Sequence, residues 1–117
     1  MGFDDDLARH LDAISRRELD ALEDSIDPDD VVLVTAKGEV VLGRDAFLDL
    51  HRDWFASDTW TIETQPVRVR EGADLATAVL RIRYRDRDID ERSVLSLVFR
   101  SHGDRWLMVQ DQNTPTV

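Results

Sequence analysis

Residues 75–112 read LATAVLRIRYRDRDIDERSVLSLVFRSHGDRWLMVQDQ, and apolar residues alternate with polar or charged ones along much of this stretch. A period of two is typical of β-strands that have one buried and one exposed face. The alternation begins at Trp60, and three turn signals interrupt it: Glu71-Gly72-Ala73-Asp74, Asp88-Ile89 and His102-Gly103. The segment from residue 60 onward therefore predicts four strands in an antiparallel meander.

Pairing these strands about their turns gathers the apolar side chains on one face. The second turn sets Tyr84 opposite Ser93, and the third sets Phe99 opposite Trp106. Trp60 and Ile62 are out of phase with the later residues of their strand. A bulge near Gln65-Pro66 would restore the phase, because one extra residue reverses the alternation and bends the strand. We therefore expect a strongly curved sheet.

The first 58 residues predict three helices and one hairpin. Leu7, Leu11 and Ile14 have the spacing of one helical face. Ser15, with Glu18 three residues later, predicts the N-cap of a second short helix that ends near Pro28. The two β-branched runs 31–34 and 40–42 flank a glycine turn and predict a hairpin, and an amphipathic pattern predicts a helix over roughly 44–56.

Length and composition indicate a single domain without disulfides or a membrane-spanning segment. The chain has 117 residues and no cysteine, which favours one domain spanning 1–117 and excludes disulfides and cysteine nucleophiles. No apolar run approaches the roughly 20 residues that a membrane span needs. The acidic start of the chain is unlike a secretory signal, so we expect a cytoplasmic protein.

The net charge of −10 comes entirely from the first half of the chain. Residues 1–58 contain 16 acidic and 6 basic residues, whereas residues 59–117 contain 9 of each. Nucleic-acid binding depends on clustered lysines and arginines that neutralise phosphates. The acidic balance therefore disfavours nucleic acid as a partner.

Two segments carry a resemblance to a known superfamily. They are residues 38–47, GEVVLGRDAF, and residues 104–115, DRWLMVQDQNTP. Together with the order of elements, they resemble the SnoaL-like and domain-of-unknown-function branches of the nuclear transport factor 2-like superfamily. The resemblance covers nearly the whole chain and implies an α+β fold, in which a curved antiparallel sheet forms a cone around three N-terminal helices. The superfamily includes isomerases, dehydratases, cyclases and hydrolases as well as association domains, so the fold alone does not select a function.

The last strand offers three polar candidates. Strand parity places Gln110 and Gln112 on the apolar face with Trp106, where they would line a pocket or bond to neighbouring backbone. The same parity sends Asp111 to the outer face, unless a bulge turns it inward. As an inward carboxylate, Asp111 would be a candidate catalytic group.

Other candidates lie on the third helix and in the sheet. His51 falls on the apolar face of its helix, and its near-neutral pKa suits a general base; the alternative is a hydrogen-bonded core histidine. Tyr84 could donate a hydrogen bond to a carbonyl, or pack as a rim aromatic. Further pocket-wall candidates, which could equally be plain core, are Trp54, Trp60 and Phe99.

No motif indicates a metal or a cofactor. The three histidines lack ligand spacing, and the residues from Asp86 onward depart from a calcium-binding loop at the glycine and final glutamate positions. We therefore predict neither a metal nor a cofactor.

The outer sheet face combines arginines with β-branched residues, which suits a homodimer interface; the alternative is a solvated face on which arginine stems cover the valines. The residues concerned are Arg68, Arg70, Arg81, Arg83, Arg85, Arg92 and Arg100, with Val79, Val94, Val98, Leu107 and Val109. Two functions remain open: a pocket protein that binds or transforms a small apolar oxygenated ligand, and a non-catalytic homodimeric association or scaffold domain whose cavity is filled by its own aromatics.

Overall fold

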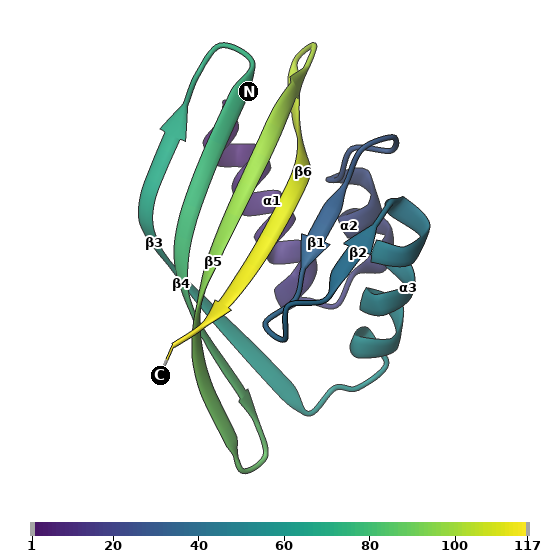
Figure 1. Cartoon of the computed structure of the whole chain (residues 1–117), viewed down its shortest axis with the longest axis vertical. Coiled ribbons are helices and arrows are strands. Elements are labelled where there is room, and N and C mark those ends of the chain that lie inside the picture. Colours follow the sequence, from purple (N-terminus) through teal and green to yellow (C-terminus); the bar gives the residue numbers. More distant parts are fainter. Residues whose placement is uncertain (1, 117) are drawn as a thin grey trace.

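The computed structural model describes residues 2–116 and contains three helices and six strands within them. In chain order these are α1 (Phe3–Ser15), α2 (Leu19–Asp24), β1 (Val32–Val34), β2 (Val40–Leu42), α3 (Arg44–Phe55), β3 (Trp60–Glu71), β4 (Leu75–Asp86), β5 (Ile89–His102) and β6 (Arg105–Pro115). The strands form one sheet in the order β2-β1-β6-β5-β4-β3 (Figure 1). The predicted α+β architecture is confirmed.

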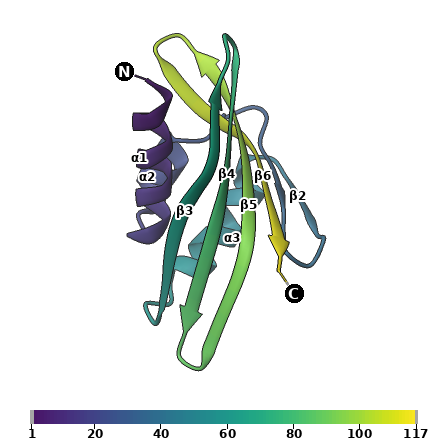
Figure 2. The ribbon, with the colours of Figure 1, turned by 90° about the vertical axis from the view of Figure 1, so that its left-hand side faces the viewer.

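The long strands form the predicted meander, and the short hairpin extends it. β1 pairs with β2 antiparallel and with β6 parallel, so the N-terminal hairpin continues the same sheet. Figure 2 shows α1 and α2 on one side of the sheet, which leaves the opposite face of the long strands uncovered. No helix among the described residues is long and apolar enough to cross a membrane.

The second helix starts later than its sequence pattern suggests. Ser15 is the last residue of α1, and Glu18 is the N-cap of α2. Between them Arg17 adopts a left-handed backbone conformation with a φ of 57°. Its guanidinium lies 4.2 Å from the centre of the Trp60 ring and donates a hydrogen bond to the carbonyl of Ser57. These tertiary contacts hold the turn at Arg17, and the prediction that Ser15 caps α2 is wrong.

The predicted bulge in β3 is confirmed. The register shifts between Pro66 and Arg68, which leaves Val67 without a partner on β4. Trp60 and Val69 consequently point to the same side, one buried and the other half-buried against the core. The bulge therefore restores the phase that the sequence pattern interrupts.

The turn between β4 and β5 lies one residue earlier than expected. Asp86 pairs with Ile89, so Arg87 and Asp88 form a two-residue turn, in which Arg87 has a φ of 55°. Tyr84 lies opposite Glu91, and the predicted pairing with Ser93 is wrong. Because the register differs by two residues, the alternation is unchanged and the apolar face is retained.

β6 contains a second bulge, which the sequence analysis did not place. Phe99 pairs with Met108, but the next pair is Val98 with Gln110, so Val109 has no partner on β5. The predicted pairing of Phe99 with Trp106 is wrong for a separate reason: the β5–β6 turn lies one residue later than expected, so His102 pairs with Arg105 and Ser101 pairs with Trp106. The extra residue reverses the alternation of everything that follows it in β6.

This reversal corrects the predicted positions of three polar residues. Gln110 and Gln112 are exposed, whereas Asp111 is only 4% exposed. The placement of Gln110 and Gln112 on the inner face is wrong. Asp111 reaches the inner face because of the bulge at Val109, and a bulge is the condition under which an inward Asp111 was expected.

The neighbours of β6 explain why its regular alternation is interrupted. At Met108 the strand exchanges hydrogen bonds with the segment after α2: its N–H donates to the Ser25 carbonyl at 3.0 Å and its carbonyl accepts from Asp27 at 2.9 Å. Beyond the bulge, residues 110–112 pair with β1 instead. β6 therefore changes partner on one side while it stays paired with β5 on the other.

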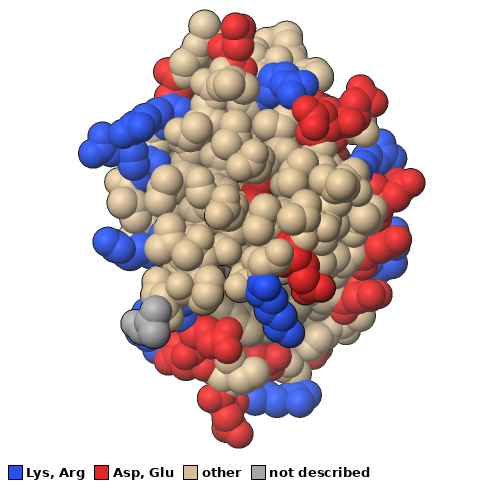
Figure 3. Space-filling model, viewed as in Figure 1, with Lys and Arg blue, Asp and Glu red and all other residues tan. Residues whose placement is uncertain are grey.

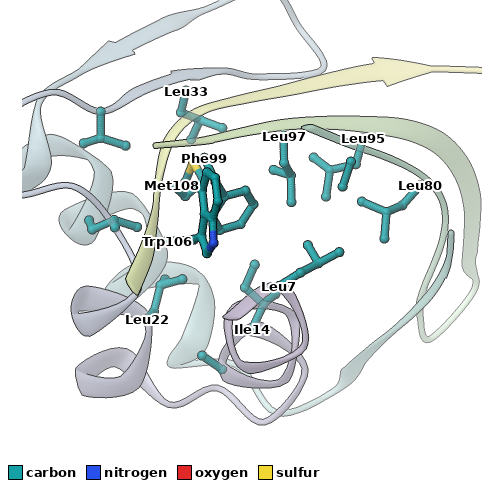
Figure 4. Packing of buried hydrophobic residues seen from close by; sticks show 14 of the residues in the cluster. Leu7, Ile14, Leu22, Leu33, Leu80, Leu95, Leu97, Phe99, Trp106 and Met108 are labelled. Carbon is teal, nitrogen blue, oxygen red and sulfur yellow. The ribbon is translucent and has the colours of Figure 1, made fainter. Parts of the chain in front are cut away.

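The core lies between α1 and the sheet. Figure 4 shows Leu80, Leu95 and Leu97 of the sheet pointing toward Leu7 and Ile14 of α1. All five side chains are buried. Burying a leucine or isoleucine side chain stabilises a fold by about 1.5–3 kcal/mol, so this interface is a major source of stability.

One buried carboxylate attaches α1 to the start of β6. Asp6 is 6% exposed, and its Oδ2 accepts a 2.8 Å hydrogen bond from the backbone N–H of Trp106. Its Oδ1 accepts a 3.0 Å bond from Arg9. The hydrogen bond between Asp6 and Trp106 joins residues that are 100 positions apart in the sequence.

We expect Asp6→Ala to destabilise the protein by about 1–3 kcal/mol, because it leaves the buried N–H of Trp106 without an acceptor. Asp5→Ala is the matched control, since Asp5 is the exposed neighbour on the same helix turn. Urea unfolding measures both variants. Equal stabilities would show that the Asp6 contact does not hold α1 in place.

Candidate active site

Asp111 is a carboxyl group held between apolar strands. It lies opposite Leu97 on β5 and opposite Leu33 on β1, and both of these leucines are buried. Burial raises the pKa of Asp111 to about 7, although a hydrogen bond from Asn113 favours the ionised form. Near neutral pH this carboxyl group is therefore able both to donate and to accept a proton.

The two oxygens of Asp111 have different surroundings. Oδ1 accepts a 3.0 Å hydrogen bond from the side-chain amide of Asn113. Oδ2 has no hydrogen-bond partner among residues 2–116, and it is not one of the fully enclosed polar atoms. Oδ2 is therefore the oxygen that remains accessible for a bound molecule.

His51 presents one ring nitrogen for chemistry and uses the other structurally. Its Nδ1 donates a 2.8 Å hydrogen bond to the carbonyl of Phe47, one turn earlier in α3. Burial lowers the pKa of His51, and the bond to Phe47 opposes this effect. The imidazole is therefore neutral at physiological pH, with an unprotonated Nε2 that is not fully enclosed.

Aromatic rings fix the orientation of His51. The Phe47 ring stacks on the imidazole with a centroid distance of 4.2 Å, and the rings of Trp54 and Phe55 meet it edge-on at 5.9 and 5.8 Å. His51 itself is only 4% exposed. Because packing and a hydrogen bond both restrain the ring, Nε2 has a defined position.

His51 and Asp111 line the same cavity, which has a volume of about 270 Å³. Thr35 and Asn113 supply its other polar side chains. The apolar walls come from both helices and strands and comprise Ile14, Leu33, Ala36, Leu50, Trp54, Ile62, Ile82 and Leu95. We call this cavity the chamber.

A wider hollow of about 770 Å³ adjoins the chamber and opens at the end of the sheet near the β4–β5 turn. We call it the mouth. Chamber and mouth share Ala36, Trp54, Ile62, Ile82 and Asn113. Ligand pockets commonly measure about 300–1,000 Å³, so the chamber suits a small group and the two together suit a larger molecule.

The chamber lining includes no lysine or arginine. An ionised Asp111 would have no positive partner there, which is consistent with its raised pKa. Among residues 2–116 no group of three potential ligand side chains could hold a metal ion. Asp111 and His51 are the titratable side chains of the chamber lining.

The aromatic candidates divide between the site and the core. Trp54 lines both chamber and mouth, and Tyr84 lines the mouth, where its hydroxyl donates to Asp86 at 3.4 Å. Trp60 is 1% exposed and stacks behind Trp54 at 4.2 Å. Phe99 is fully buried and does not belong to the lining of the chamber or of the mouth.

The position of Phe99 follows from its neighbours. It packs edge-on against Phe3, with a centroid distance of 5.0 Å, and against His10 at 5.6 Å. Phe3 also meets Trp106 at 5.7 Å. These rings form an aromatic cluster in the core that is separate from the chamber lining.

Sequence reasoning missed Asn113 and Thr35. Both depend on β6 beyond its bulge and on the β1–β6 pairing, neither of which was predicted. One signal was present: residues 106–109, WLMV, form an unbroken apolar run that is followed by polar residues. Such a run is typical of a strand covered on both faces, and it weakens a parity argument carried across it.

Comparison with family models identifies the class. Residues 6–116 match the SnoaL-like domain, and the chain belongs to this family. A comparison with curated proteins finds no match.

Solved structures with the same fold have diverse descriptions. A proposed calcium/calmodulin-dependent protein kinase type II association domain from Thiobacillus denitrificans superposes with a TM-score of 0.86 at 19% identity, covering 98% of this chain and 95% of that one. A proposed dehydratase of the NTF2-like family from Streptomyces avermitilis gives 0.80 at 19% identity, covering 96% and 92%. A ketosteroid isomerase-like protein from Erwinia carotovora atroseptica gives 0.76 at 14% identity, covering 97% and 93%. At these identities the likeness establishes the fold.

We expect the burial of Asp111 to reduce stability at high pH. A folded-state pKa of about 7 exceeds the ordinary value of 3.8, so ionisation favours the unfolded state as the pH rises from about 4 to 7. At about 1.4 kcal/mol per pH unit, the cost above pH 7 is on the order of 4 kcal/mol. Asp111→Asn removes this ionisation.

Urea unfolding of wild type and Asp111→Asn at pH 4.5 and pH 8 measures the effect. The wild type should lose stability relative to the variant between these two pH values. If the difference between the two proteins does not change with pH, the carboxyl group titrates in an ordinary environment.

Proposed function

We propose that this SnoaL-like protein binds a small apolar oxygenated molecule in the chamber and transforms it by general acid–base catalysis. The observation that carries the proposal is the buried Asp111 carboxyl group, which shares an apolar cavity with a neutral His51 and with no cation. Paired titratable groups with opposite shifts in pKa are typical of an acid and a base. Isomerisation and dehydration are reactions that such a pair can catalyse.

In the proposed step, both residues act on the part of the substrate that is bound in the chamber. His51 Nε2 removes a proton from a carbon or hydroxyl of the substrate, and Asp111 Oδ2 donates a proton to a substrate oxygen. The electron pair of the broken bond forms a new double bond as the oxygen is protonated or leaves as water. Return of the proton from His51 to product or solvent, and reprotonation of Asp111, complete the cycle.

The surroundings of the chamber support a ligand of this type. Its walls are largely aliphatic, and Trp54 extends the apolar surface to the mouth. In the chamber a negatively charged ligand would meet a carboxyl group and no basic side chain, whereas the mouth carries Arg92 together with Asp90 and Glu91. An uncharged molecule with a carbonyl or hydroxyl group is the better fit.

Ligand binding is tested by thermal unfolding against lactones, steroids, polyketide-like phenols and epoxides. A ligand at about 100 times its Kd adds roughly 2.7 kcal/mol, a shift of several degrees for a domain of this size. For a ligand that is also turned over, we expect Asp111→Asn and His51→Ala each to reduce kcat/KM by about 100-fold or more, without loss of folding. Normal turnover in both variants would contradict the proposed acid–base chemistry.

A second proposal concerns the outer face of the sheet, where we infer that two copies of this chain associate. The register forms two rows of uncharged side chains across five neighbouring strands, from β2 to β4. One row is Leu42, Val32, Gln110, Val98 and Thr77, and the other is Val40, Val34, Gln112, Ser96 and Val79. Figure 3 shows this side of the molecule, with an uncharged middle and charged residues mainly near its margins.

The arginines contribute less to this face than their number suggests. Arg83 forms a bidentate pair with Asp90, at 3.0 and 2.8 Å, and Arg85 pairs with Glu63. Arg100 pairs with Asp30 at 2.8 Å. These three arginines therefore form ion pairs within their own chain. The two rows of uncharged side chains are the part of the outer sheet face that favours association between copies.

Native mass spectrometry and light scattering test the association. We expect a dimer for the wild type and a monomer for Val98→Asp, which places a charge among the uncharged rows. Ile89→Asp is the control, because Ile89 is 47% exposed at the β4–β5 turn and lies outside these rows. A monomeric wild-type protein would contradict the proposed interface.

A further inference from the structure

Asn113 occupies the point where the chamber, the mouth and Asp111 meet. It follows Asp111 by two residues on β6 and lies opposite Leu95 on β5. It lines both chamber and mouth and is half-buried. Side chains two residues apart on a strand share a face, so the amide reaches the carboxyl group directly.

The hydrogen bond between the two side chains treats the carboxyl oxygens unequally. The Nδ2 amide group of Asn113 donates to Oδ1 of Asp111 at 3.0 Å, while Oδ2 has no partner among the described side chains and backbone groups. An amide N–H requires a lone pair, so Oδ1 serves as the carbonyl-type oxygen when the acid is protonated. The exchangeable proton then resides on Oδ2.

We propose that Asn113 is a positioning residue for Asp111: its amide fixes the orientation of the carboxyl group and leaves Oδ2 as the proton-exchanging oxygen in the chamber. This inference rests on the proposed function, since it assigns a role within the same site. The same contact opposes the effect of burial. A donor to a carboxylate stabilises the ionised form, so Asn113 keeps the acid from becoming too weak to release its proton near neutral pH.

The test follows the side-chain carboxyl carbon of Asp111 by ¹³C NMR over a pH series, in protein labelled at aspartate. The signal is assigned by its absence in Asp111→Asn. The variants are Asn113→Leu, which removes the donor and keeps the branched shape of the side chain, and Asn113→Asp, which replaces the donor with a second carboxyl group. Gln112→Leu is the matched control, because Gln112 is the adjacent residue on the exposed outer face.

We expect the titration midpoint of Asp111 to rise by about one pH unit or more in Asn113→Leu, because a hydrogen bond to a charged group is lost. It should also rise in Asn113→Asp, since a neighbouring negative charge disfavours ionisation. Gln112→Leu should titrate like the wild type. Thermal unfolding identifies any variant that fails to fold, and the second Asn113 variant then decides the outcome.

Two results would overturn the proposal. If both folded Asn113 variants titrate like Gln112→Leu, the amide does not act on Asp111. If the midpoint falls in Asn113→Leu, the amide accepts a hydrogen bond from the protonated acid instead of donating to the carboxylate.

The titration needs no substrate, so the two proposals fail separately. Absence of turnover with a shifted midpoint in Asn113→Leu would remove the proposed function and leave the interaction in place. If turnover depends on Asp111 but the midpoint does not shift in Asn113→Leu, the proposed function stands and the proposed role of Asn113 fails. Where turnover is found, the same variants should shift the pH dependence of kcat/KM in parallel with the titration, which a purely structural defect would not do.

Discussion

The bulge at Val109 decides which polar side chains of β6 enter the molecule. Without it, Gln110 and Gln112 would face the core and Asp111 would face outward. With it, Asp111 lies between Leu33 and Leu97, and Asn113 lies two residues further along the same face. The bulge occurs where β6 changes its neighbour from the segment after α2 to β1. The candidate site thus depends on a local backbone irregularity at a change of strand partner.

Placing Asp111 there has an electrostatic consequence. The chamber lining offers hydrogen-bonding groups but no positive charge, so the carboxyl group is most stable when it is neutral. His51 is held neutral by its own burial, with Nδ1 bonded to Phe47. A carboxyl group with a pKa near 7 and a neutral imidazole in an apolar cavity can exchange protons with a substrate near neutral pH.

The sequence predicts the elements of this fold better than their register. The alternation from Trp60 onward and the helical spacing in the first 58 residues identify the meander, the three helices and the hairpin, and the phase break near Pro66 reveals the first bulge. The second bulge could not be placed in the same way, because the apolar residues 106–109 show no alternation to be broken. The face to which each later side chain points depends on that one extra residue. A regular alternation therefore places Gln110 and Gln112 on the wrong face and does not identify Asn113. The inward orientation of His51 could be predicted, because local spacing alone determines which residues share a helical face.

The pH titration of Asp111 in the wild-type protein, measured from the ¹³C shift of its side-chain carboxyl group, tests directly whether the chamber holds a buried acid. We expect a midpoint near 7, because the bulge places the group in an apolar chamber without a cation. A midpoint near the ordinary value of 3.8 would contradict it. In that case Asp111 would be solvated or paired, and the chamber would lack the acid on which the proposed chemistry depends.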